Sequence, residues 1–273
     1  MRKQCRKIPT AARVAGDGLP GKAFAGMLLV ALLAACAPVQ TSGDPVTWMG
    51  SQELQELGEK FLAAGDTGQA LRYLTAAEEK DPKNPSIHYD LGLAYEARRL
   101  EEKAVEHLHK AVELKPDYSE AHNALGVLYA KRGRTDKALE HFHKALANPF
   151  YRTPHYAYFN IGKIYQDEAR YAEALRYFDD AIHFEKGYAQ AHLHRGRVLE
   201  AMGRKGEARH AYRLAVYYGP DLPEAQFHYG RFLVQDGNWE DAAAAFRRVL
   251  RLAPGTPLAE AAANYLHTMG FED

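Results

Sequence analysis

Cysteine, long hydrophobic runs and a surplus of charge of one sign are all scarce in this sequence. Basic and acidic residues number 35 each, but six basic and only one acidic residue lie among the first 35 positions, so the rest of the chain is mildly acidic. That balance argues against nucleic acid as the main partner, because binding to phosphates needs clustered positive charge. The apolar run at residues 23–33 is eleven residues long, whereas a membrane-spanning helix needs roughly 20.

Signatures of catalysis are also missing. The sequence has no glycine-rich phosphate loop, no HExxH, no GxSxG and no paired cysteines. Thirteen histidines raise the question of a metal site, and His107-x-His109, His141-x-His143 and His192-x-His194 are the closest pairs. Residues two apart on a helix point about 200° apart, so such a pair cannot hold one ion. We therefore expect no catalytic residue, no cofactor and no metal.

Residues 1–35 have the pattern of a signal peptide, in which a basic segment precedes a short apolar run. The run ends in Leu33-Ala34-Ala35-Cys36, which resembles a bacterial lipobox. That resemblance implies lipidation at Cys36, and Ala37 in place of an acidic residue favours the outer membrane. The mature chain would then hold one cysteine and no disulfide. An ordinary secretory signal with an incidental cysteine, or an uncleaved anchor, are the alternatives.

The lipidated cysteine is followed by a segment rich in proline, glycine and small polar residues, and we predict that residues 36–50 form a flexible tether. Trp48 is expected to be the first residue to contact the folded part of the protein. Its alternative role is to bind a partner.

The body of the sequence repeats with a period of 34 residues, interrupted once by a spacing of 36. Around each repeated glycine the apolar pattern is helical, a breaker follows, and a second helical stretch ends near a proline. Each unit is therefore predicted to be an antiparallel helix pair, and small residues in register let the two backbones approach closely. The three rows in register are Gly58, Gly92, Gly126, Gly162, Gly196 and Gly230; Ala70, Ala104, Ala138, Ala174, Ala208 and Ala242; and Ala77, Ala111, Ala145, Ala181, Ala215 and Leu250.

The order L-G-x-x-Y, then A-x-x-x-F, then P resembles the tetratricopeptide repeat, as in Leu125-Gly126, Tyr129, Ala138 and Phe142. The resemblance implies an all-α, right-handed superhelical solenoid. A further helix at residues 257–269, within the segment 257–273, would cap its open apolar end. The six predicted repeats are 51–84, 85–118, 119–152, 155–188, 189–222 and 223–256.

Two additional residues between the third and fourth repeats interrupt the period. Pro149 ends one helix, and Thr153-Pro154 is a strong start signal for the next. Phe150 and Tyr151 between them either fill a wider joint or present an aromatic surface to a partner. Together with the repeat number and the lipobox, this bridge resembles the pilotins, lipoproteins of type IV pilus biogenesis. The resemblance implies an outer-membrane protein, facing the periplasm, that binds the secretin subunit and helps it reach the membrane and assemble.

The repeat class also implies a concave groove lined by the fifth and ninth residues of each repeat. In the second half of the chain these positions combine apolar side chains with a basic column, which suits a peptide with apolar side chains and an acidic flank. Alternatively, the apolar residues contact neighbouring helices and the basic ones are merely solvated. The predicted partner-binding residues are Tyr89, Asn123, Phe150, Tyr151, Phe159, Lys163, Leu193, Arg197, Phe227 and Arg231.

The two-carboxylate clamp of chaperone-binding repeats is not matched, since Asn123 and Asn160 are its only candidate residues. The sequence thus predicts a lipid-anchored protein that binds another protein, with no small-molecule substrate. A different envelope scaffold that recruits cell-wall synthases or hydrolases remains as the alternative.

Overall fold

The computed structural model describes residues 44–271, which are helical apart from short turns. The predicted signal peptide and Cys36 lie outside these residues. The longest described helices have 14 residues, and none is both long and apolar enough to cross a membrane. The helices are α1 Pro45–Trp48, α2 Ser51–Ala63, α3 Thr67–Lys80, α4 Pro85–Ala97, α5 Glu101–Leu114, α6 Ser119–Lys131, α7 Thr135–Leu146, α8 Pro154–Asp167, α9 Tyr171–Phe184, α10 Ala189–Ala201, α11 Lys205–Tyr218, α12 Pro223–Gln235, α13 Trp239–Leu252 and α14 Pro257–Thr268.

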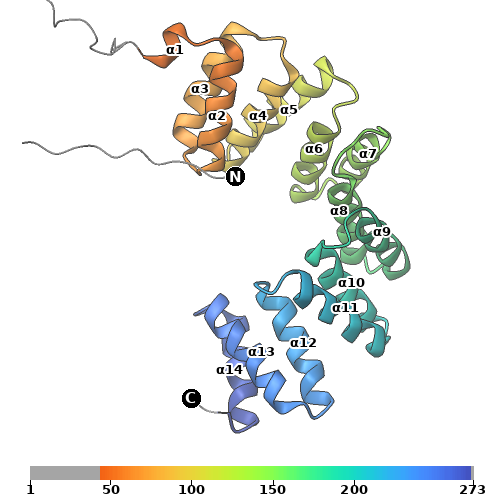
Figure 1. The fold of residues 1–273 in the computed structure, drawn as a ribbon. Coiled ribbons are helices and arrows are strands. Elements are labelled where there is room, and N and C mark those ends of the chain that lie inside the picture. Colours follow the sequence, from red (N-terminus) through yellow and green to blue (C-terminus); the bar gives the residue numbers. More distant parts are fainter. Residues whose placement is uncertain (1–43, 272–273) are drawn as a thin grey trace, which may run out of the picture. The chain divides into compact units, whose positions relative to one another are not determined.

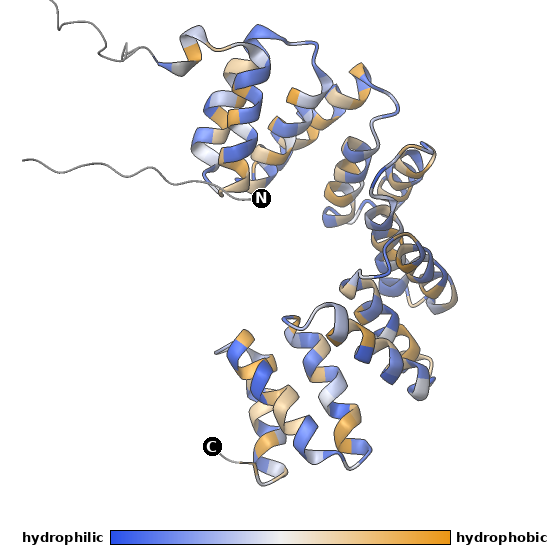
Figure 2. Ribbon diagram, in the orientation of Figure 1, coloured by the Kyte–Doolittle hydropathy of each residue, from blue (hydrophilic) through white to orange (hydrophobic). Residues whose placement is uncertain are grey.

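The helices pack as consecutive pairs, so the predicted all-α solenoid is confirmed. The first and second helix of each repeat pack along each other, from α2 with α3 to α12 with α13, and each second helix also contacts the first helix of the next pair (Figure 1). Hydrophobic and hydrophilic residues alternate along each helix (Figure 2), as a helix with one buried stripe requires. The last helix, α14, packs on α13 and α12, where a capping helix is expected.

The repeated glycines set the distance between the two helices of each pair. A Cβ atom built on Gly126 would lie 2.5 Å from the ring of Phe142, whereas carbon atoms in contact prefer about 3.5–4.0 Å. The other five glycines of this row show the same relation to a side chain of the second helix. Those six side chains, all fully buried, are Leu74, Leu108, Phe142, Phe178, Tyr212 and Phe246.

The turn between the helices of a pair needs a left-handed residue. Gly65, Gly133 and Gly203 have φ values of 79°, 68° and 74° there, in agreement with the breakers in the sequence. In the second and fourth repeats the same position holds Arg99 and Ala169, at φ 61° and 56°. A left-handed conformation costs an L-residue roughly 1–2 kcal/mol, so the packing of the pair holds these two turns in place.

The start of the described chain differs from the predicted tether. Residues 45–48 form the short helix α1, and Asp44 makes an ion pair with Arg72 of α3. Val46 and Met49 pack against the apolar core of the first repeat, while Trp48 is 61% exposed. The prediction that Trp48 makes the first contact is therefore wrong, because α1 turns its indole ring outwards.

Replacing Gly126 with alanine should destabilise the protein by about 1–3 kcal/mol, because the new methyl group would overlap the buried ring of Phe142. Gly206→Ala is the matched control: it also lies in a helix, α11, but its Cβ would meet no atom within 4 Å. We expect the control to be as stable as the wild type or more stable by up to about 1 kcal/mol, because alanine favours the helix. Denaturant unfolding followed by circular dichroism measures both, and equal stability of the two variants would contradict the packing argument.

Candidate partner-binding surface

The bridge between α7 and α8 is held by one asparagine. The side chain of Asn148 donates from Nδ2 to the carbonyl of Asp117 at 3.0 Å and accepts from the backbone N–H of Phe150 at 2.9 Å. Helix α7 ends before Pro149, and α8 begins after its N-cap Thr153, as predicted, although the Thr153 hydroxyl makes no capping bond. The first bond ties the bridge to the loop between α5 and α6, and the second fixes its local conformation.

The two aromatic residues of the bridge differ in exposure: Tyr151 is buried and Phe150 is exposed. Tyr151 is 8% exposed and belongs to an apolar core shared by the second, third and fourth repeats, and burial raises the pKa of its hydroxyl to about 12. It fills the joint, so its prediction as a partner-binding residue is wrong. Phe150 is 86% exposed, beside a surface hollow lined by Pro116, Asp117 and Lys144.

Other exposed aromatic side chains lie at the loops that join consecutive repeats. Tyr156 packs edge-on against Tyr188 with ring centroids 5.7 Å apart, and Phe184 stacks on Tyr158 at 5.3 Å. Sequence analysis missed this set, although Phe184 and Tyr218 occupy the same position, the last of the second helix, in consecutive repeats. We call the exposed members the aromatic edge: Phe150, Tyr156, Phe184, Tyr217 and Tyr218.

The fifth positions of the later repeats are less accessible than predicted. Leu193 is 1% exposed and Phe159 is 9% exposed; the ring of Phe159 packs on Phe178 and Tyr188. Phe227 is half-buried and contacts Phe246. The alternative that these side chains contact neighbouring helices is therefore correct for Leu193 and Phe159, which are buried in one apolar cluster with Phe178.

The basic column at the ninth positions is partly neutralised. Arg197 pairs with Glu224 at 2.7 Å, and Arg231 pairs with Glu200 at 3.2 Å. Lys163 is exposed, lies 5.9 Å from the centroid of the Phe159 ring and has no ion pair within residues 44–271. Both acidic partners come from the first helices of neighbouring repeats. They do not occupy the fifth or ninth position of a repeat, so the sequence pattern did not predict these ion pairs.

Polar contacts fill the same face in the earlier repeats. Gln55 is buried and donates from Nε2 to Asp90 Oδ2 at 2.6 Å. Tyr89 is half-buried, with its ring 5.2 Å from that of Tyr118. Across the bridge, Asn160 donates to Asn123 Oδ1 at 3.3 Å. The Gln55–Asp90 and Asn160–Asn123 bonds each join neighbouring repeats, so Asn123 and Asn160, the two candidates for the carboxylate clamp, bond to each other.

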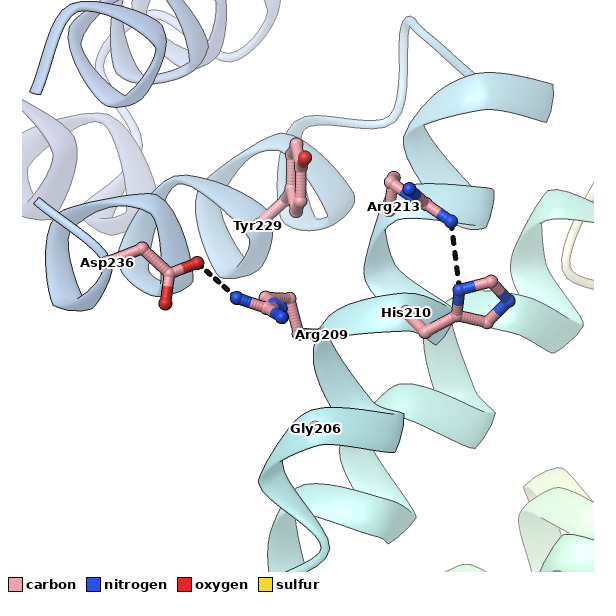
Figure 3. Close-up of a pocket in the computed structure, with 6 residues that line it drawn as sticks. All are labelled: Gly206, Arg209, His210, Arg213, Tyr229 and Asp236. Atoms are coloured by element: carbon pink, nitrogen blue, oxygen red, sulfur yellow. Dashed lines mark hydrogen bonds and ion pairs between the residues drawn. The ribbon is translucent and has the colours of Figure 1, made fainter. Parts of the chain in front are cut away.

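A second hollow lies between α11 and α12 (Figure 3). Arg209 makes an ion pair with Asp236, and Arg213 donates to His210 Nδ1 at 3.0 Å. Both guanidinium groups thus have partners within the chain, so this hollow does not offer unpaired positive charge to a ligand.

Family models of the tetratricopeptide repeat match residues 56–118, 159–223 and 196–257, and another matches residues 119–148. The chain belongs to the tetratricopeptide-repeat family. Comparison with curated protein sequences gives no significant match.

Solved structures with the same repeat fold cover most of this chain. PilF of Pseudomonas aeruginosa superposes with a TM-score of 0.71 at 20% identity, covering 78% of this chain and 96% of PilF. PilW, described as a widely conserved type IV pilus biogenesis factor, gives a TM-score of 0.68 at 21% identity, covering 78% of this chain and 98% of PilW. MamA gives 0.51 at 24% identity, covering 62% of this chain and 92% of MamA. At these identities the likeness shows the shared fold.

Asp90 provides a pH-dependent test of the packing on this face. Burial raises the pKa of its carboxyl group to about 7, above the value of about 3.9 in an unfolded chain. The folded state therefore binds more protons between these two values, and the stability contributed by Asp90 falls as the pH rises through them. Asp90→Asn retains an oxygen acceptor for Gln55 without the charge. At pH 8 the free energy of unfolding of the variant should exceed that of the wild type by on the order of 1–3 kcal/mol.

That advantage should disappear towards pH 4, where Asp90 is protonated in the folded state. Urea unfolding of both proteins from pH 4 to pH 8 measures the difference, and effects of the histidines cancel in it. A constant difference over this range would contradict the raised pKa.

Proposed function

We propose that this protein is an outer-membrane lipoprotein that binds a partner in type IV pilus biogenesis and promotes the targeting or assembly of the secretin. The observation that carries the proposal is the fold match to PilF and PilW, which covers 96% and 98% of their chains. The matched part comprises stacked helix pairs, which present an extended surface for protein partners. The lipobox resemblance at Cys36 supports the membrane location.

The proposed anchor accounts for how a helical body would stay at the membrane. Each buried CH₂ group of a lipid contributes about 0.8 kcal/mol, and a single acyl chain gives only reversible binding. A lipidated Cys36 would carry several chains, so anchoring would be stable. The proposed location faces the periplasm, where the helix pairs could meet a secretin subunit before it enters the membrane.

We place the partner contact on the aromatic edge, with Phe150 as its centre. Exposed apolar side chains grouped on one surface mark sites of protein association, and aromatic residues dominate the energy of such interfaces. Phe150 is the most exposed large apolar side chain of the described residues, and the hollow beside it can receive a side chain of a partner. Lys163 of α8, which has no ion pair among the described residues, offers a positive charge for an acidic flank.

Deleting the gene from its host should leave the secretin monomeric and outside the outer-membrane fraction. The wild-type gene should restore assembled secretin, whereas Cys36→Ala should leave the protein soluble in the periplasm and restore it poorly. Fractionation and immunoblotting of both proteins provide the measurement. Normal secretin assembly without the gene would contradict the proposed function, and mislocalised cell-wall enzymes in its place would favour the alternative scaffold. Outer-membrane partitioning of Cys36→Ala would contradict the lipid anchor.

Replacing Phe150 with serine should weaken secretin binding by about 2 kcal/mol or more, the range of an interface residue that carries much of the binding energy. Trp239→Ser is the matched control, because Trp239 is also a large exposed aromatic residue, 50% exposed, but begins α13 within a repeat. Binding of purified secretin to the two variants and the wild type measures the effect. If Phe150→Ser binds as tightly as Trp239→Ser, the contact lies elsewhere, and Lys163→Glu tests the first-helix face.

A further inference from the structure

We propose that Glu78, His88 and His107 form a binding site for a divalent transition metal ion, with Zn²⁺ as the best match. The three residues lie on α3, α4 and α5, so the ion would join the first repeat to the second. Each offers one ligand atom, and the three atoms lie within 4.8 Å of one another. Two imidazoles and one carboxylate are a ligand set that zinc takes in proteins. This inference does not depend on the proposed function.

The separations of the three ligand atoms fit a tetrahedral ion. His88 Nδ1 lies 3.4 Å from His107 Nδ1 and 3.3 Å from Glu78 Oε1, and His107 Nδ1 lies 3.7 Å from the same oxygen. Zinc binds nitrogen at about 2.0–2.1 Å and carboxylate oxygen at about 2.0–2.2 Å, so the edges of its tetrahedron measure roughly 3.3–3.5 Å. One face of such a tetrahedron is therefore in place before any ion is added.

A hydrogen bond on the far side of His88 orients it as a ligand. His88 Nε2 lies 2.9 Å from the carbonyl oxygen of Pro82, and only an N–H donor can satisfy that oxygen. The proton on Nε2 leaves the lone pair of a neutral ring on Nδ1, which points at the cluster. Metal-binding histidines commonly donate their other ring N–H to a backbone carbonyl in this way.

The cluster is accessible from solvent. It lies in an open hollow that is also lined by Glu106, Lys110 and Glu113, so water can reach the fourth ligand position. The side chain of Glu78 is 28% exposed, so an ion can enter from this side.

The next repeat contains the same histidine pair without the carboxylate. His122 Nδ1 lies 3.0 Å from His141 Nδ1, and His122 Nε2 lies 3.0 Å from the carbonyl of Pro116. The position equivalent to Glu78, 34 residues later, is Val112. The pair alone is thus a packing device that the repeats share, and the carboxylate is what distinguishes the first cluster. The second pair serves as an internal control.

The His107-x-His109 pair considered in the sequence does not chelate, because the two rings diverge. His109 Nε2 lies 2.8 Å from the hydroxyl of Tyr129, on the side of α5 that faces the third repeat. The ligands of the proposed site come from three helices and are separated by 10 and 19 positions in the sequence. Spacing within one helix could not indicate them.

The test is a Zn²⁺ titration of the untagged protein by calorimetry. We expect the wild type to bind one equivalent of Zn²⁺. Glu78→Gln and His107→Gln should each lower the zinc affinity by more than about 100-fold. A residue that only orients a ligand changes metal affinity by about 10–100-fold. His141→Gln, the matched change in the second pair, should retain the one equivalent. Circular dichroism verifies that every variant keeps its helix content.

Substituting Co²⁺ for zinc supplies a second readout, because tetrahedral cobalt absorbs visible light far more strongly than octahedral cobalt. The wild type and His141→Gln should give the intense spectrum, and Glu78→Gln should not. Unchanged zinc affinity in Glu78→Gln, loss of the site in His141→Gln, or an octahedral spectrum in the wild type would overturn the proposal. Failure here would leave secretin binding unaffected, so the two proposals are tested separately.

Discussion

Close contact between the two helices of each pair is the constraint on which the structure depends. A glycine on the first helix lies directly against a leucine, phenylalanine or tyrosine on the second, at distances that leave no room for a Cβ atom. Because one pair buries only part of its apolar surface, the next pair must cover the rest. The same packing holds Arg99 and Ala169 in left-handed turns, so local strain is tolerated where the pair is tight.

This packing also decides which residues remain available to a partner. Phe159 and Leu193 are buried in the apolar core, and neighbouring first helices bring acidic side chains next to Arg197 and Arg231. Surface aromatic residues are concentrated instead at the loops between repeats, where no neighbouring helix covers them. The bridge of two additional residues enlarges that surface, because it buries Tyr151 as a wedge and leaves Phe150 exposed.

The repeat period made the fold predictable, since rows of glycine and alanine at 34-residue spacing report directly on helix contacts. The exposure of single side chains was harder to predict. The repeat class implies that the position of Leu193 lines the groove, but here the side chain is 1% exposed because it packs into the apolar core. Glu78, His88 and His107 lie on three different helices, and the packing of these helices brings them together. A periodic pattern within one helix therefore could not predict the cluster. The sequence does not indicate the short helix α1, which packs Val46 against the core and leaves Trp48 exposed.

The proposed partner contacts the loops joining the repeats rather than the face of the first helices. Amide hydrogen exchange of the protein, measured with and without bound secretin, tests this most directly because it reports every segment at once. The account predicts slower exchange at residues 147–156 and at the C-terminal ends of α9 and α11, with little change elsewhere. Protection confined to the middle of α8, α10 and α12 would contradict it and place the partner on the first-helix face.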